Sequence, residues 1–288
     1  AYVDLVRLNT HVRHVIPIAL RRWRKSLLAA TTRAEIAAFY HLLRREPYDF
    51  VFDTQGLLKT GLVMRLARLA DSGQRIGLAN ATEGSGYESL SKLFHTRSVT
   101  VDRRAHAVLR ARLVAAAAFD QMVEGIPDFA LTPPDTTANH PNWLPTRPYA
   151  VFFHATARAA KQWSVEAWVA IAAILEKRDW PVLLPWGSDS ERRAAEQLAA
   201  RMPNARVLPR LSMMEAVLLA QRASLVIGVD TGLTHIAAAY CRPTIELYSD
   251  SPRWKTEGNW SSNVINLGDT RQPPTVAEVE KAVLTLLH

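Results

Sequence analysis

The second half of the chain alternates short apolar runs with segments whose apolar residues recur at helical spacing. The apolar runs predict buried strands at 149–154, 181–185, 224–229 and 244–248. The helical spacing predicts helices at 164–178, 188–202, 212–222, 231–240 and 275–288. Three of these helices open on a capping box, in which Glu follows Ser188, Ser212 or Thr275 by three residues. Short strands that alternate with helices are typical of a parallel sheet covered on both faces.

The first half follows the same pattern less regularly. It predicts strands at 14–19, 48–53 and 75–78, and helices at 33–45, 57–70 and 105–119. Six of the sixteen prolines lie between Pro127 and Pro148, and proline removes backbone donors and disfavours helix, so this segment is predicted to be an extended linker. We therefore expect an α/β protein with an N-terminal domain at 1–148, its linker at 127–148, a second domain at 149–272 and a C-terminal helix at 273–288.

Composition and charge narrow the class of protein. The 288 residues are 48% hydrophobic and 22% charged, as in ordinary globular proteins. The single cysteine, Cys241, excludes a disulfide framework and a Cys-based zinc site, and it favours a reducing, cytoplasmic setting. No apolar run approaches the roughly 18 residues of a membrane helix, and the first residues lack the pattern of a secretory signal. The net charge of +8 favours anionic partners.

One predicted strand runs directly into a helix through Asp230-Thr-Gly232. The first N–H groups of a helix have no partner within it and carry the positive end of its dipole, which suits a diphosphate. Gly232 lets a ligand approach the backbone closely, and His235 lies one turn after Thr231, toward the crevice at the carboxyl ends of the strands. The spacing alone also allows a structural alternative, in which Asp230 is only an N-cap and His235 a core histidine.

Other segments accompany this junction in a fixed order along the chain. They are Asp53–Leu57, His154–Thr156 with Lys161 and Trp163, Leu184–Gly187 with Glu191, and Asp230–His235. Together they resemble the lipopolysaccharide heptosyltransferases of glycosyltransferase family 9, over nearly the whole chain. The resemblance implies a GT-B fold, with two Rossmann-like doubly wound domains facing a central cleft. It also implies inverting, metal-independent transfer from ADP-L-glycero-D-manno-heptose, held mainly by the second domain.

The resemblance assigns the phosphate-binding part of this donor site. Thr231 and Gly232 would offer backbone N–H groups to the diphosphate, and Lys161 would add a positive charge. Thr156, at the end of the second domain's first strand, would also reach phosphate.

The resemblance also implies which residues bind the two sugars of the donor. Glu191 would accept bonds from the ribose hydroxyls, although the same residue could serve only as the glutamate of its capping box. Asp230 would bind heptose hydroxyls, and His235 would lie beside the sugar or the phosphate.

Four positive charges in five residues form a basic run, which consists of Arg21, Arg22, Arg24 and Lys25. Such a run is often only a solvated face. Here the segment Ile18–Lys25 resembles family members that add the first heptose to Kdo-lipid A in inner-core synthesis, and arginine pairs well with Kdo carboxylates and lipid phosphates. His106 and Arg110, one helical turn apart, would extend this acceptor surface or form an exposed helix face. We therefore expect a cytoplasmic protein, peripheral at the anionic inner face of the inner membrane.

The family's general base is an aspartate in an N-terminal strand–turn–helix segment, which no residue of this chain matches. We expect the chain to begin inside the N-terminal domain, without that segment. Asp53, at the end of a strand facing the same crevice, is the nearest substitute and is expected to position the acceptor. No two aspartates stand two residues apart and no His-Glu-x-x-His occurs, so neither a metal site nor a cofactor is predicted.

Two other functions are compatible with parts of the sequence. A basic nucleic-acid-binding protein is supported by the charge alone, because no nucleic-acid-binding motif occurs, and we expect no nucleic-acid partner. A nucleotide-sugar epimerase would share the two-domain architecture, but the basic run at 21–25 has no use in that reaction.

Overall fold

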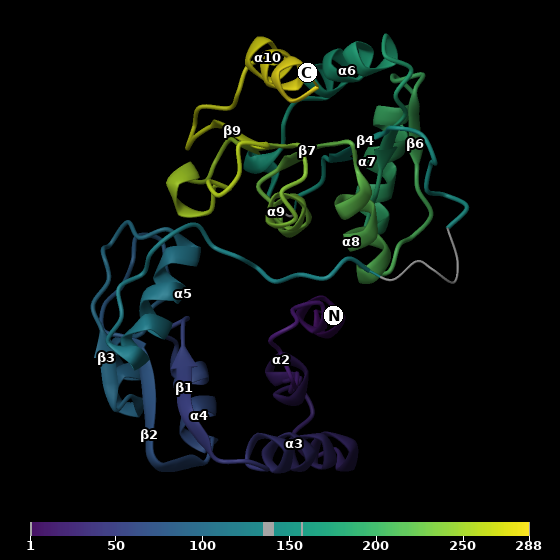
Figure 1. Cartoon of the computed structure of the whole chain (residues 1–288). Helices are drawn as coiled ribbons and strands as arrows, with labels where there is room; N and C mark the ends of the chain where they lie inside the picture. The colour runs from purple at the N-terminus through teal and green to yellow at the C-terminus, as the bar shows by residue number, and fades with distance from the viewer. Residues whose placement is uncertain (1, 135–140, 157, 288) are drawn as a thin grey trace. The chain divides into compact units, whose positions relative to one another are not determined.

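The structure is a computed structural model that describes residues 2–134, 141–156 and 158–287 and consists of two compact units. The small unit is His14–Ile126, and the large unit contains the described residues before His14 and from Pro127 onward. Each unit has one parallel sheet (Figure 1). The described part of the predicted linker holds only a single bridge, between Leu131 and Asn9, and residues 135–140 of it lie outside the described residues. The domain limits predicted above, which assign the residues before His14 to the N-terminal domain, remain a proposal.

The large unit has six parallel strands in the order β6-β5-β4-β7-β8-β9. They are β4 (Ala150–Phe153), β5 (Val182–Leu184), β6 (Ala205–Val207), β7 (Leu225–Val229), β8 (Thr244–Tyr248) and β9 (Val264–Gly268). Every residue of β4, β5, β7 and β8 is buried, which explains why these strands appear in the sequence as continuous apolar runs. The strand order reverses between β4 and β7, and doubly wound sheets bind their ligands outside the carboxyl ends of such strands.

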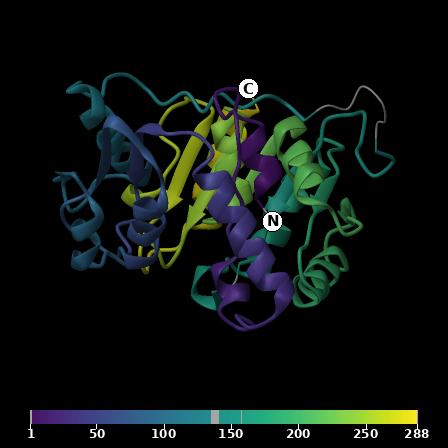
Figure 2. The ribbon, with the colours of Figure 1, turned by 90° about the horizontal axis from the view of Figure 1, so that it is seen from below.

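Helices cover both faces of this sheet. They are α6 (Val165–Glu176), α7 (Asp189–Ala199), α8 (Met213–Arg222), α9 (Gly232–Ala239) and α10 (Val276–Leu286). Helices α6, α7 and α10 share one core cluster with the sheet, and α8 and α9 share the other, on the opposite face (Figure 1). The short helix α1 (Val3–Arg7) packs against α8 (Figure 2). The three predicted capping boxes, at Ser188, Ser212 and Thr275, are confirmed.

The small unit has three parallel strands in the order β1-β2-β3. They are β1 (Tyr48–Asp53), β2 (Leu69–Leu78) and β3 (Arg97–Val99). Its helices are α2 (Leu20–Trp23), α3 (Ala30–Leu43), α4 (Leu58–Leu66), α5 (Ala107–Ala116) and the 3₁₀ turns η1 (Ser89–Phe94) and η2 (Ala117–Phe119). Ile76 and Leu78 of β2 pack with Val114 of α5 in its core. None of the helices in the described part of the chain is long and apolar enough to span a membrane.

Two predictions for the small unit are wrong. Residues 14–19 form no strand, because this half-exposed stretch pairs with no other strand and Pro17 lacks a backbone donor. The helix predicted at 57–70 ends at Leu66, and β2 begins three residues later. The Arg75 side chain donates to the carbonyls of Met64 and Ala67, at 3.1 and 3.0 Å, and so satisfies backbone acceptors at the helix end.

The sequence pattern also missed three short strands, β3, β6 and β9. Strands β3 and β6 have three residues each, alternate half-buried with exposed positions, and lie at the edges of their sheets. Strand β9 is the other edge of the large sheet and is mostly half-buried. Edge strands that bury little apolar surface give the weakest pattern in a sequence.

Candidate functional site

The site begins where β7 passes into α9. Helices α6, α7, α8 and α10 each begin on a Ser or Thr whose hydroxyl accepts from an amide of the first turn. Thr231, the N-cap of α9, makes no such bond, and its hydroxyl lies 3.2 Å from Thr234 Oγ1 instead. The side chain of Thr231 therefore does not occupy the first N–H groups of α9, and these groups are available to a ligand at the start of the helix.

Two glycines shape this junction in different ways. A Cβ at Gly228 would lie 2.1 Å from Thr234 Oγ1, so only glycine lets α9 pack this closely on β7. The Thr234 hydroxyl donates to the Val229 carbonyl at 2.9 Å and ties the first turn of α9 to the strand. At Gly232, by contrast, a Cβ would meet no neighbouring atom within 4 Å. The backbone at the start of α9 therefore faces open space, as the prediction for Gly232 requires.

A cavity of about 460 Å³ opens at this end of the sheet. Its lining includes four of the predicted donor residues: Thr156, Glu191, Thr231 and Gly232. Its apolar wall comes from Phe153, Pro185, Trp186, Leu211, Met213, Ala216, Leu233 and Ile236, and Tyr2 and Leu5 of α1 also line it. Ligand sites in proteins typically measure about 300–1,000 Å³ and combine apolar walls with a few polar groups. The cavity has the size and chemistry of a small-molecule site.

Glu191 has a structural task in addition to its place in the cavity wall. Its Oε2 accepts from the backbone N–H groups of Gly187 and Ser188, at 2.7 and 3.1 Å, which completes the capping box of α7. Both bonds use the same carboxylate oxygen. The capping role of Glu191 and a bond from its carboxylate to a ribose hydroxyl are therefore compatible.

The other three predicted donor residues form an ion-pair network beside the cavity. Lys161 Nζ lies 2.5 Å from Asp230 Oδ2, and His235 Nε2 lies 3.0 Å from Asp230 Oδ1. The Ser251 hydroxyl also donates to Asp230 Oδ2, at 2.5 Å. Among the described residues, no group of three or more His, Cys, Asp or Glu side chains is placed to hold a metal ion.

This network excludes the structural alternative for Asp230 and His235. The N-cap of α9 is Thr231, so Asp230 lies one position outside the helix and is not its cap. The side chain of His235 is 27% exposed and bonds to charged groups, so it is not a core histidine. Both residues instead belong to a cluster of charges at the carboxyl end of β7.

The network shifts the pKa values of both residues. Burial opposes ionisation of Asp230, but hydrogen bonds from His235, Lys161 and Ser251 outweigh it and hold the pKa of this carboxyl well below its usual range. Burial likewise disfavours charged His235, but bonds to Asp230 and Glu246 and the charges of these carboxylates raise the pKa of His235 to about 9. At neutral pH the network therefore holds an anionic Asp230 and a cationic His235.

Sequence reasoning missed the residues that surround this network. Ser251 and Thr256 follow β8 and reach Asp230 at 2.5 and 3.5 Å, although nothing in their local sequence marks them. Glu246 and Tyr248 lie on β8 and are fully buried. Glu246 did leave a signal, because a charged residue inside the apolar run 244–248 is unusual for a buried strand and calls for a partner.

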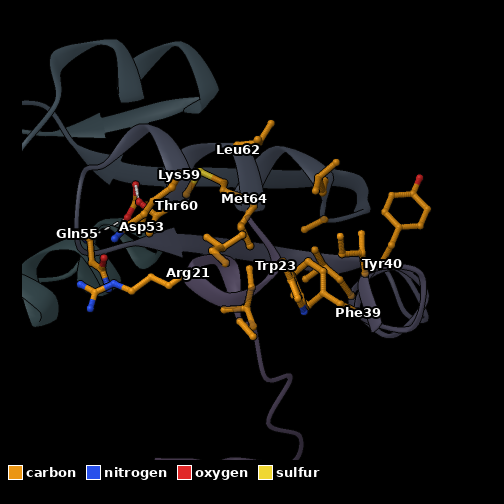
Figure 3. A pocket seen from close by; sticks show the side chains of 18 of the residues that line it. Arg21, Trp23, Phe39, Tyr40, Asp53, Gln55, Lys59, Thr60, Leu62 and Met64 are labelled. Carbon is orange, nitrogen blue, oxygen red and sulfur yellow. Dashed lines mark hydrogen bonds between the residues drawn. The ribbon is translucent and has the colours of Figure 1, made fainter. Parts of the chain in front are cut away.

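Three of the predicted acceptor residues line one cavity of the small unit, of about 1110 Å³: Arg21, Arg22 and Arg24. Figure 3 shows Arg21 reaching along it toward the end where Asp53 and Gln55 lie. Arg22 is bound to Glu35 through two bonds of 3.0 and 2.5 Å, and Trp23 donates to the same carboxylate at 2.7 Å. Arg22 is therefore less available to an acceptor than Arg21.

The remaining predicted acceptor residues do not line this cavity. Lys25 is exposed just beyond the end of α2. His106 is the N-cap of α5, where its Nδ1 accepts from the Val108 N–H at 3.2 Å. Arg110 donates to the Thr82 hydroxyl at 2.8 Å. These contacts give His106 and Arg110 structural tasks within the small unit.

Asp53 lies in the wall of the same cavity, at the end of β1. Its carboxylate accepts from the N–H groups of Gln55 and Gly56 at 3.0 and 3.1 Å, and from the Thr60 hydroxyl at 2.9 Å. Burial alone would raise the pKa of Asp53, but His95 and these three donors lower it below its usual range. A carboxylate held in this way is a weak base, which favours a role in shaping the turn before α4.

Comparison with known proteins identifies the family. The model of glycosyltransferase family 9 (heptosyltransferase) matches residues 36–284. The chain is 36% identical to lipopolysaccharide heptosyltransferase 1 of Pseudomonas aeruginosa over 270 residues, which cover 93% of this chain and 72% of the relative. The solved structure of E. coli heptosyltransferase WaaC with ADP is similar at a TM-score of 0.84 and 30% identity, over 99% of this chain and 87% of that one.

WaaC has also been solved with ADP-2-deoxy-2-fluoro heptose, and this structure is similar to the chain at a TM-score of 0.79 and 30% identity, over 99% of this chain and 87% of that one. The likeness confirms the predicted α/β fold of GT-B type, whose two Rossmann-like domains contain parallel sheets. The resemblance read from short segments of the sequence is confirmed over most of the chain. The chain therefore belongs to glycosyltransferase family 9, the heptosyltransferases.

Proposed function

We propose that this protein transfers L-glycero-D-manno-heptose from ADP-heptose to Kdo of Kdo-lipid A, in the synthesis of the lipopolysaccharide inner core. The observation that supports it best is the open N-terminus of α9 beside a cavity of about 460 Å³, in a chain whose similar structures were solved with ADP and with an ADP-heptose analogue. Family 9 and the named relatives support the chemical class, a glycosyltransferase.

The donor would lie along the carboxyl ends of β4, β5 and β7. The nucleoside would fill the apolar cavity, with its ribose at Glu191. The diphosphate would meet the first N–H groups of α9 and the Lys161 ammonium, which lies next to this helix through its bond to Asp230. The heptose would then lie at Asp230, whose carboxylate accepts hydrogen bonds from sugar hydroxyls.

The proposed reaction is a single displacement. The acceptor hydroxyl loses its proton to a base or to solvent as its oxygen forms a bond to the anomeric carbon, the bond from that carbon to the diphosphate oxygen breaks, and ADP leaves with the electron pair. The charge that develops on ADP is stabilised by the start of α9 and by Lys161. Attack opposite the leaving group inverts the anomeric centre.

The acceptor side of the proposal rests on the exposed cations of the small unit. Arg21 and Arg24 line its cavity and would bind Kdo carboxylates or lipid phosphates, and Lys25 lies close by in sequence. An acceptor anchored in lipid would bring the protein to the anionic inner face of the inner membrane. We propose this peripheral, cytoplasmic location together with the acceptor.

The test is transfer by the purified protein from ADP-heptose to Kdo-lipid A, with the product identified by mass spectrometry. We expect addition of one heptose and release of ADP. A matched pair of variants, Lys161→Ala in the network and Lys177→Ala at the end of α6, separates a site effect from a general one. Transfer from UDP-sugars without transfer from ADP-heptose would contradict the proposal. Conversion of the donor without acceptor would identify an epimerase.

A further inference from the structure

Glu246 is a charged residue in the middle of a fully buried strand, and its side chain has no exposure. Its Oε1 lies 2.9 Å from His235 Nδ1. Its Oε2 accepts from the Tyr248 hydroxyl and from the Gly258 N–H, each at 2.9 Å. A buried carboxylate is costly unless it is paired and hydrogen-bonded, and all of these partners are fixed by the fold.

His235 lies between two carboxylates. Its Nδ1 faces Glu246 at 2.9 Å and its Nε2 faces Asp230 at 3.0 Å. An ionised carboxylate only accepts hydrogen bonds, so both ring nitrogens must carry a proton if both bonds are made. The ring is then an imidazolium. Together with Lys161 the network holds two cations and two anions, so its buried charges balance.

We propose that Glu246 is a positioning residue of the donor site, which keeps His235 as an imidazolium so that His235 orients Asp230 toward the donor sugar. This inference rests on the proposed function and deepens it. Glu246 acts from inside the sheet and touches no substrate. His235 is then a fixed cation near the diphosphate, and it is not the base that accepts a proton from the acceptor.

The charged and titratable groups around His235 agree with this arrangement. They come from three elements: Lys161 from the η3 turn (Ala159–Lys161), Asp230 from the end of β7, and Glu246 and Tyr248 from β8. Burial lowers the pKa of His235, but its bonds to the two carboxylates raise it to about 9. Burial and the nearby charge of Glu246 raise the pKa of Tyr248, so the phenol stays protonated and donates to Glu246.

The direct test follows the protonation of His235 by NMR in the full chain with ¹⁵N-labelled histidine, using His235→Gln to assign its signals. In the unmodified protein we expect both ring nitrogens protonated at pH 7.5, with a titration midpoint near 9. Glu246→Gln is nearly isosteric but neutral, and we expect it to move the midpoint down toward about 6.5, the ordinary value for histidine. Tyr248→Phe is the matched control, because it removes another partner of Glu246 but leaves its charge, so the midpoint should stay high.

The second readout is donor binding. At pH 8 we expect Glu246→Gln to raise the KM for ADP-heptose about tenfold with little change in kcat, because Asp230 loses a charged partner that orients it. At pH 6 most of this loss should be recovered, since the imidazolium forms again. A purely structural role of Glu246 would give a loss that does not depend on pH.

Three results would overturn the inference. One is a neutral His235 at pH 7.5 in the unmodified protein, a measurement that needs no variant and remains valid if Glu246→Gln folds poorly. Another is an unchanged His235 titration in Glu246→Gln. The third is a lowered midpoint with an unchanged donor KM at pH 8. Failure of the proposed function is distinguishable, because the unmodified protein would then transfer no heptose while the NMR result for His235 stood.

Discussion

The two units differ in how they hold the charged residues of the proposed donor and acceptor sites. In the large unit, Lys161 and Asp230 form an ion pair whose side chains are only 18% and 11% exposed. In the small unit, Arg22 and Glu35 form a pair whose side chains are 61% and 40% exposed, and Arg21 and Arg24 are exposed around a wide cavity. Charges removed from water interact strongly and keep one geometry, whereas exposed charges are screened and mobile.

The sheets of the two units also differ in how deeply their strands are buried. Strands β4, β5, β7 and β8 of the large unit are buried throughout, whereas β1 of the small unit is half-exposed and Phe52 on it is 39% exposed. A rigid sheet with fixed charges suits recognition of one small ligand in one orientation. Exposed arginines on a more open unit suit attraction of a large anionic acceptor. The proposed donor site is therefore built into the core of its unit, whereas the proposed acceptor residues lie on a surface.

The sharpest test of this comparison is Lys161→Ala. We expect kcat/KM for transfer to fall by about 100-fold or more, because the proposed function places this cation, which is paired with Asp230, at the leaving diphosphate. Lys161→Arg keeps the charge and should retain more activity. Steady-state kinetics with ADP-heptose varied at saturating acceptor would measure both. Near-normal activity of the alanine variant would show that the buried pair has no catalytic importance.

The free energy of unfolding should also depend on pH through His235, a residue of the large unit. The folded pKa of His235, about 9, lies above its unfolded value of about 6.5, so its stabilising contribution is complete below pH 6.5 and is lost as the pH rises through 9. The free energy of unfolding should then fall by on the order of 3 kcal/mol relative to His235→Gln over this range.

Urea unfolding followed by tryptophan fluorescence can measure this effect, because all of the eight tryptophans except Trp23 belong to the large unit. His106→Gln in the small unit controls for the loss of a histidine as such. An equal pH dependence in the unmodified protein and in His235→Gln would mean that His235 is not held as a cation.

Substitutions of the small unit's arginines should weaken binding of the acceptor without changing binding of the donor. Arg21→Ala and Arg24→Ala should each raise the KM for Kdo-lipid A by about tenfold, because each removes one charge-assisted contact. The KM for ADP-heptose should not change. Arg22→Ala is the matched variant, and its effect should be smaller because this guanidinium is bound to Glu35. A larger effect of Arg22→Ala would show that the ion pair opens for the acceptor.

The smallest expected effect comes from the cap of α7. Ser188→Ala should destabilise the protein by about 1 kcal/mol, since a hydroxyl acceptor for the first turn is lost. It should also weaken ADP binding a few-fold, because Glu191 loses the other half of its capping box beside the cavity. Thr275→Ala removes the equivalent cap of α10, which does not line that cavity, and should lower the melting temperature without affecting ADP binding by calorimetry.

The sequence by itself predicted strands β4, β5, β7 and β8 and helices α6 to α10 of the large unit, but not its edge strands β6 and β9. Its buried strands are continuous apolar runs, and Ser188, Ser212 and Thr275 mark helix starts because an N-cap acts on N–H groups two or three residues away. The junction at 230–235 could be predicted equally well, because the strand end, the turn and the first turn of the helix are formed by residues adjacent in sequence. The same local reading failed at 14–19, where an apolar stretch has no neighbouring strand to pair with.

Only the tertiary structure decided which charges meet. Lys161 and Asp230 are 69 residues apart, and no local pattern predicts that they form an ion pair. Glu246 was visible as a charge inside an apolar strand, but its bond to His235 exists because β8 lies beside β7 and α9 packs across both. Local signals act through the backbone of neighbouring residues, whereas a buried charge finds its partner only when the sheet brings distant segments into contact.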